Sequence, residues 1–180
     1  MRFIKLISVL VVLVFSACGG IYKPGSVRGY DPKTASVLTY GGGAYRVGVL
    51  PSNWQRESIK WKAVLFRERA TQATITVSSW CKSAFSDEPL KDLDRELYHG
   101  LSKVRVDDSQ IVKLAHFDAR RTTASGEFDG RKVWLRTYIL KLNECVFDFV
   151  YVTKEGRWSG QKDFDAMVMG FDYLKGPDRL

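Results

Sequence analysis

The chain has 180 residues, of which 45% are hydrophobic, and a formal net charge of +8. This length suits one ordinary domain and is too short for two unless both are minimal. The basic residues are spread along the chain, with no run longer than Arg120-Arg121 or Arg131-Lys132, and this pattern excludes a nucleic-acid footprint.

Residues 1–17 have the pattern of a signal peptide. Arg2 and Lys5 precede an apolar run over 6–15 that contains a single polar residue; the run has the length of a signal-peptide core and is too short to span a bilayer. The stretch Phe15-Ser16-Ala17-Cys18 resembles the lipobox of bacterial lipoproteins, in which the cysteine is acylated and becomes the mature N-terminus. This resemblance implies that Cys18 is the lipidation site and anchors the chain in a membrane. The alternative is an ordinary secretory signal with an incidental cysteine.

Residues 18–44 are predicted to be a lipidated N-terminus followed by a flexible tether. The segment is rich in glycine and has two prolines and no sustained hydrophobic period. As a coil of about 25 residues it would hold the domain roughly 25 to 30 Å from the membrane. Gly19 is not the aspartate that retains many Gram-negative lipoproteins at the inner membrane, so we expect an outer-membrane location in the cell envelope.

The folded domain is expected over 45–175, with a short C-terminal tail over 176–180. Its first strand is indicated by alternation at Tyr45, Val47 and Val49, and it ends before Pro51. Residues 60–67 and 72–80 are rich in β-forming side chains and predict two more strands. A helix capped by Ser86 or Asp87 is predicted to follow, because four leucines share one stripe: Leu90, Leu93, Leu97 and Leu101.

Four further strands are expected at 110–117, 119–128, 132–142 and 145–153. Two-residue hairpin turns at Asp129-Gly130 and Asn143-Glu144 would fix their register, with Phe128 facing Arg131 and Leu142 facing Cys145. A last helix begins at Ser159 or Gly160, and its apolar stripe is Phe164, Met167, Val168, Phe171 and Leu174. The predicted fold class is therefore α+β: a largely antiparallel sheet of about six to seven strands with an amphipathic helix on each side.

This register gathers large side chains on one face of the sheet. The candidate binding face consists of Trp134, Arg136, Tyr138, Phe147, Phe149 and Tyr151. One helix would not normally cover so much aromatic surface, so two interpretations remain: a groove for a lipid, glycan or peptide, or the larger half of the core.

Asp148 falls on the opposite face, beside Ile139, diagonal to Lys141 and one strand from Arg120. An unpaired buried carboxylate is costly, so we expect a paired structural ion there. The alternative is a catalytic acid.

Cys81 and Cys145 remain once Cys18 is assigned to lipid. They either form a disulfide, which would contribute roughly 3 to 5 kcal/mol by closing a loop of about 60 residues, or are two small buried hydrophobes.

Catalytic motifs are not found. His99 and His116 have no metal-ligand spacing, and the glycines at 41–43 lack the lysine and hydroxyl residue of a phosphate loop. We therefore expect no enzyme activity, no metal and no cofactor. A nucleophile formed by Cys81 or Cys145 with a histidine is the remaining enzymatic alternative.

The order of elements resembles the PsbP-like superfamily, which includes DcrB-type envelope lipoproteins. The resemblance spans about 45–174 and rests on a strand running into Pro51-Ser52-Asn53-Trp54, a helix led by Pro89-Leu90, the Asp129-Gly130 turn and a terminal helix ending near Gly170-Phe171. It implies an accessory or binding module without shared catalytic residues. We expect a non-enzymatic lipoprotein that docks, through a protein partner, onto an envelope assembly for transport, secretion or surface functions. The alternative is a binding module that uses the aromatic face.

Overall fold

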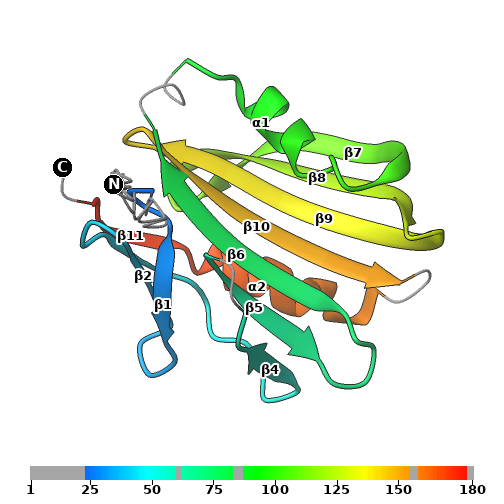
Figure 1. Ribbon diagram of the computed structural model, residues 1–180, viewed down its shortest axis with the longest axis horizontal. Helices are drawn as coiled ribbons and strands as arrows, with labels where there is room; N and C mark the ends of the chain where they lie inside the picture. Colours follow the sequence, from blue (N-terminus) through cyan, green and yellow to red (C-terminus); the bar gives the residue numbers. More distant parts are fainter. Residues whose placement is uncertain (1–22, 60–61, 83–86, 155–157, 178–180) are drawn as a thin grey trace, which may run out of the picture.

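The computed structural model describes residues 23–59, 62–82, 87–154 and 158–177; the predicted signal peptide and Cys18 lie outside these ranges. The described chain forms two antiparallel sheets and two short helices (Figure 1). The larger sheet has seven strands in the spatial order β4 (Trp54–Glu57), β5 (Ala63–Glu68), β6 (Thr74–Cys81), β10 (Cys145–Lys154), β9 (Arg131–Leu142), β8 (Phe117–Phe128) and β7 (Ser102–Leu114). The smaller sheet has four, in the order β1 (Val27–Asp31), β2 (Ser36–Thr39), β3 (Ala44–Arg46) and β11 (Asp172–Lys175). The helices are α1 (Leu90–Glu96) and α2 (Gln161–Met169).

The two hairpins of the larger sheet have the predicted register. Phe128 pairs with Arg131, and Leu142 pairs with Cys145. Both residues of each turn have positive φ, for example 48° at Asp129 and 72° at Gly130, which is the backbone conformation that tight hairpin turns demand. Strand β7 begins well before the predicted residue 110 and forms the edge of the sheet.

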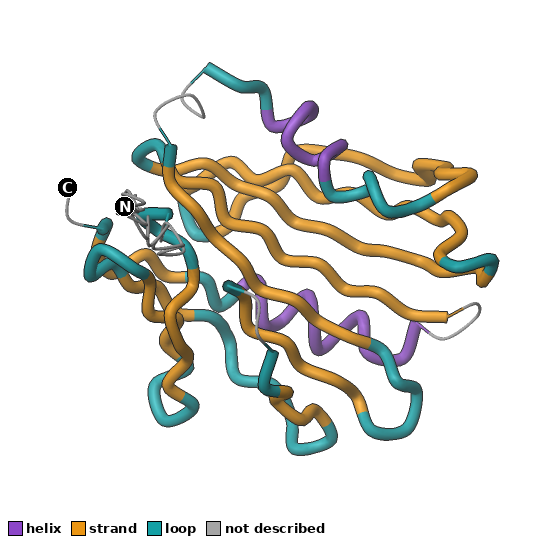
Figure 2. Tube along the Cα trace, viewed as in Figure 1, coloured by secondary structure: helices purple, strands orange, loops and turns teal. Residues whose placement is uncertain are grey.

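The two helices lie on opposite faces of the larger sheet (Figure 2). Leu93 of α1 packs with Ile139, whereas the ring of Phe164 in α2 lies 5.7 Å from that of Tyr138. Consecutive strand residues point to opposite faces, so the helices cannot share one. The predicted helix on each side is confirmed only in part, because α1 has seven residues and the face below α2 is also covered by the smaller sheet.

The prediction of a flexible tether is wrong for residues 23–44, which contain β1 and β2 and enter β3. Val37 is fully buried, and the Tyr45 ring meets the edge of Phe147 at 5.0 Å. These strands have only three to five residues each, too few for a visible hydrophobic period. Their sheet is completed by β11, far away in sequence, so local composition does not reveal it.

Helix α2 ends at Met169, with Gly170 as its C-cap, and the predicted stripe does not reach Leu174, which lies in β11 and is 46% exposed. Gly170 and Gly48 pack backbone to backbone: a Cβ on Gly170 would stand 2.6 Å from the Gly48 Cα. The N–H of Gly48 also donates to the carbonyl of Met167 at 2.7 Å. This close approach joins α2 to the chain leaving β3. Neither helix within the described ranges has the length and apolar character needed to cross a membrane.

Candidate functional site

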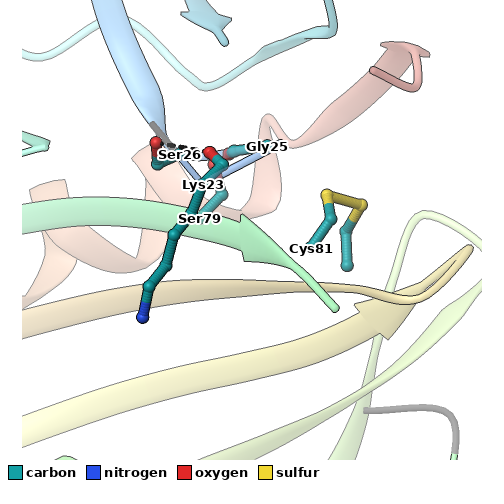
Figure 3. The surroundings of a disulfide bond; sticks show 6 residues. Lys23, Gly25, Ser26, Ser79 and Cys81 are labelled. Carbon is teal, nitrogen blue, oxygen red and sulfur yellow. Dashed lines mark hydrogen bonds between the residues drawn. A yellow bond between two sulfur atoms is a disulfide. The ribbon is translucent and has the colours of Figure 1, made fainter. Parts of the chain in front are cut away.

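The chain downstream of Cys18 is fixed to the end of β6 as soon as the described residues begin. The N–H of Cys81 donates to the carbonyl of Pro24 at 2.8 Å, and the Ser79 hydroxyl donates to the carbonyl of Gly25 at 2.7 Å. Figure 3 shows this segment beside the sulfur atoms of a disulfide. Segment 23–26 is therefore part of the folded domain.

Cys81 and Cys145 form this disulfide. They are opposite each other in the pairing of β6 with β10, so of the two alternatives left by the sequence the structure contains the bond. Neither sulfur is a free thiol, which removes the basis for a cysteine–histidine nucleophile. His99 instead meets Glu96 on the surface at 2.9 Å, and His116 lies against the Phe117 ring.

The candidate binding face of aromatic residues is closed, so its interpretation as a groove is wrong. Tyr138, Phe147, Phe149 and Tyr151 are buried, beneath α2 and the smaller sheet. The Tyr151 and Phe164 rings stack at 5.7 Å.

The two remaining members of that face, Trp134 and Arg136, lie at its margin. The ring centroids of Trp134 and Trp158 lie 6.5 Å apart. Arg136 Nε lies 3.1 Å from a carboxylate oxygen of Asp165, which also accepts the Tyr138 hydroxyl proton at 2.9 Å. The contacts of Asp165 join α2 to the sheet, and Trp134 packs on the turn that precedes α2.

A second polar centre, which the sequence did not reveal, lies under α1 on the other face. Asp94 is buried and accepts hydrogen bonds from the hydroxyls of Tyr98 at 2.6 Å, Thr122 at 2.7 Å and Thr137 at 2.9 Å. Arg120 Nε lies 3.7 Å from the same carboxylate. Burial and the hydrogen bond to Asp94 raise the pKa of Tyr98 well above its ordinary value. Through the hydrogen bonds of Asp94 to Thr122 and Thr137, this cluster holds α1 on the sheet.

Asp148 does not form the predicted ion pair. It stands beside Ile139, as the register required, and it is 8% exposed, but Arg120 pairs with Asp94 instead. Its one hydrogen bond comes from the Ser78 hydroxyl to Oδ2 at 3.3 Å, and Oδ1 has no partner among the described residues. Burial raises the pKa of this carboxyl to about 7.

Asp148 lines a cavity of about 390 Å³ between α1 and strands β6, β10 and β9. The lining residues are Trp80, Glu88, Leu93, Glu96, Leu97, Ile139, Val146 and Asp148. Within the described ranges no group of three or more histidine, cysteine or acidic side chains could hold a metal ion. The chemically distinctive feature of the site is thus an apolar cavity with one under-bonded carboxylate at its sheet side.

Neither a protein-family model nor a curated protein sequence matches the chain. Solved structures do resemble its fold. LpqN, involved in cell envelope biogenesis of Mycobacterium tuberculosis, aligns with a TM-score of 0.57 at 12% identity, over 74% of this chain and 86% of LpqN. A protein of Bacteroides thetaiotaomicron VPI-5482 aligns with a TM-score of 0.56 at 14% identity over 78% of this chain; this chain spans only 48% of that protein.

The cyanobacterial PsbP of Synechocystis sp. PCC 6803 aligns over 89% of this chain and 99% of its own length, at 16% identity and a TM-score of 0.49. A TM-score at that level does not establish a shared fold. For LpqN and the Bacteroides protein, identities of 12% and 14% show a shared fold and leave activity and partners open.

Proposed function

We propose that this protein is a non-enzymatic envelope lipoprotein, anchored through Cys18, that holds a docking domain close to the membrane surface for a larger envelope assembly. The observation that carries the proposal is the attachment of segment 23–26 to the end of β6. The fold shared with LpqN, which is involved in cell envelope biogenesis, is consistent with it. An outer-membrane site is the location we propose, from the residue after Cys18.

The attachment point limits how far the domain can stand from an anchored Cys18. Lys23 is five residues beyond that cysteine, and a fully extended chain spans at most about 3.6 Å per residue. The reach is therefore at most about 18 Å, shorter than the predicted tether would have given. A domain on such a short link presents one end to the membrane and offers its long sheet edge to partners.

Strand β7 is the surface we assign to docking. It has 13 residues and lies at the edge of the larger sheet, paired with β8 alone in the part of the chain that the structure describes. Val106 and Ile111 are 50% and 51% exposed on it. An edge strand with exposed apolar side chains is suited to pairing with an extended strand of a partner protein.

The anchor is tested by growing cells that express the full chain with an alkyne analogue of palmitate. We expect label on the natural chain and none on Cys18→Ser, while Cys81→Ser, which leaves Cys18 intact, keeps its label. An unlabelled natural chain would show that the signal is an ordinary secretory one. Density separation of the membranes then tests the outer-membrane location.

The partner is tested by placing a photo-crosslinking residue at Ile111 in the full chain and irradiating intact cells. A matched control carries the same residue at Val49, which is 78% exposed but lies away from β7. We expect a crosslink to a different envelope protein from position 111 and none from position 49. Recovery of the monomer alone under several growth conditions, or of a second copy of this chain, would contradict the proposal.

A further inference from the structure

The cavity beneath α1 has the size and the walls of a ligand site. Its volume of about 390 Å³ falls in the range of small-molecule pockets. Five of its lining side chains are apolar: Trp80, Leu93, Leu97, Ile139 and Val146. It lies on the face opposite the closed aromatic face, so it is a different site from the groove that the sequence suggested.

The buried carboxylate of Asp148 has hydrogen-bond acceptor capacity that the described residues leave unused. Among the described residues, Asp148 Oδ1 has no hydrogen-bond partner, and Oδ2 accepts a hydrogen bond from the Ser78 hydroxyl alone, at 3.3 Å. Removing a carboxylate from water without a donor or a counter-charge is costly. A polar group of this kind in an apolar cavity marks the place where a ligand donor would sit.

Charge on the cavity walls selects the kind of donor. Glu88 and Glu96 join Asp148, and no lysine or arginine is among the lining residues that the structure describes. Two basic side chains of this face have partners of their own: Lys141 Nζ donates to the carbonyl of Glu88 at 2.6 Å, and Arg120 lies beside Asp94. Anions are therefore repelled. A bare metal ion would find one buried carboxylate where calcium needs six to eight oxygen ligands.

We propose that this cavity binds a small molecule that carries a protonated amine on an apolar body, with the ammonium group on the carboxylate of Asp148 and the body against Trp80 and Leu97. The ammonium would supply a donor and a counter-charge to this carboxylate in one charge-assisted bond. The apolar body would cover the leucine, isoleucine and valine side chains of the wall. This inference is independent of the lipid anchor and of the docking edge.

Amine binding at this site should depend on pH, because it is linked to the ionisation of Asp148. Burial raises the pKa of Asp148 to about 7, the Ser78 hydroxyl lowers it and the charge of Asp94 raises it. A bound ammonium favours the ionised carboxylate, so amine affinity should fall as the pH drops below about 7. The other charged side chains around it are Glu96 and Asp94 from α1, Glu88 just before α1, Lys141 from β9 and Arg120 from β8.

The test uses the full chain, labelled with ¹⁵N and kept in mild non-ionic detergent, titrated with phenethylamine. We expect amide shifts at Val146 and Ile139, and binding about tenfold or more tighter than for 2-phenylethanol, which lacks the charge. 3-Phenylpropionate should not bind. Affinity for phenethylamine should be higher at pH 8 than at pH 6. An absence of shifts at millimolar amine, or equal binding of amine and alcohol, overturns the proposal.

Two variants distinguish the effect of the Asp148 charge on binding from the effect of the cavity volume. Asp148→Asn keeps the shape and should weaken phenethylamine binding about tenfold, whereas Asp118→Asn, on the exposed part of β8, should leave it unchanged. Leu97→Trp should block the cavity to the amine and to the alcohol alike. Undiminished binding by Asp148→Asn or by Leu97→Trp refutes the site. The shifts of the natural chain decide the question even if a variant folds poorly.

Discussion

Gly25 packs directly against the sulfur of Cys81: a Cβ on Gly25 would stand 2.0 Å from Sγ. Gly25 also has a φ of +76°, which favours glycine over all other residues. Segment 23–26 and the disulfide therefore form one packed unit that only glycine permits at this position. The feature lies within the segment predicted to be a tether, and it holds residues 23–26 against the end of β6.

We expect Gly25→Ala to lower the free energy of unfolding by about 2 to 4 kcal/mol, from the forced shift of the disulfide together with the left-handed backbone. Gly130→Ala is the matched control for the backbone alone. Gly130 has a φ of +72°, yet nothing lies within 4 Å of its added Cβ, so its cost should be about 1 kcal/mol. Urea unfolding followed by tryptophan fluorescence measures both. Equal losses in the two variants would show that the contact with Cys81 is unimportant.

We expect the double variant Cys81→Ala, Cys145→Ala to be about 4 kcal/mol less stable than the oxidised chain. The bond spans 64 residues, and closing a loop of that size restricts the unfolded ensemble by about this amount. In this background Gly25→Ala should cost less, because the Sγ atom that it meets is gone. Urea unfolding of the four combinations gives the coupling energy. A coupling energy of zero would separate the disulfide from the segment packed on it.

Asp94 should be the residue on which the position of α1 depends most. Asp94→Ala leaves the hydroxyls of Tyr98, Thr122 and Thr137 without their acceptor, and we expect a loss of about 2 to 4 kcal/mol. Faster amide hydrogen exchange in α1 should accompany it. Asp92→Ala is the control, since the Asp92 side chain is about half exposed and its one ion pair among the described residues is with Arg95, at 3.6 Å; its cost should stay below about 0.5 kcal/mol. Slow exchange in α1 of Asp94→Ala would contradict this role.

The hairpins were predictable from sequence because their cause is local. Asp129-Gly130 and Asn143-Glu144 determine both turn type and register, and the register then places each strand residue on a face. The local amino-acid sequence also indicated α2 as far as its C-cap, Gly170. These elements depend on residues within a few positions of one another.

The carboxylates and the small sheet were not predictable for the opposite reason. Arg120 was expected beside Asp148, but α1 brings the carboxylate of Asp94 to within 3.7 Å of Arg120 Nε. No local sequence pattern indicates where on a sheet a helix will pack. Likewise β3 finds its partner β11 at the other end of the domain. The aromatic face was correctly placed by register, but its cover came partly from that unpredicted sheet.

The pH dependence of stability should reveal the state of Asp148. Its pKa in the folded chain is raised to about 7 from an ordinary value of 3.8, so between these values the folded state holds a proton that the unfolded state has released. The free energy of unfolding must then fall as the pH rises through this window, by up to about 1.4 kcal/mol per pH unit. Above about pH 7 the contribution of this group levels off, with a total loss of a few kcal/mol.

Asp148→Asn should remove that slope, because the amide cannot ionise, and the variant should be more stable than the natural chain at pH 8. Asp118→Asn, at an exposed position, should keep the slope of the natural chain. Urea unfolding between pH 4 and pH 8 measures both. Parallel pH profiles for Asp148→Asn and the natural chain would mean that Asp148 already has a counter-charge in the folded protein, and the cavity would then have no unmet need for a cation.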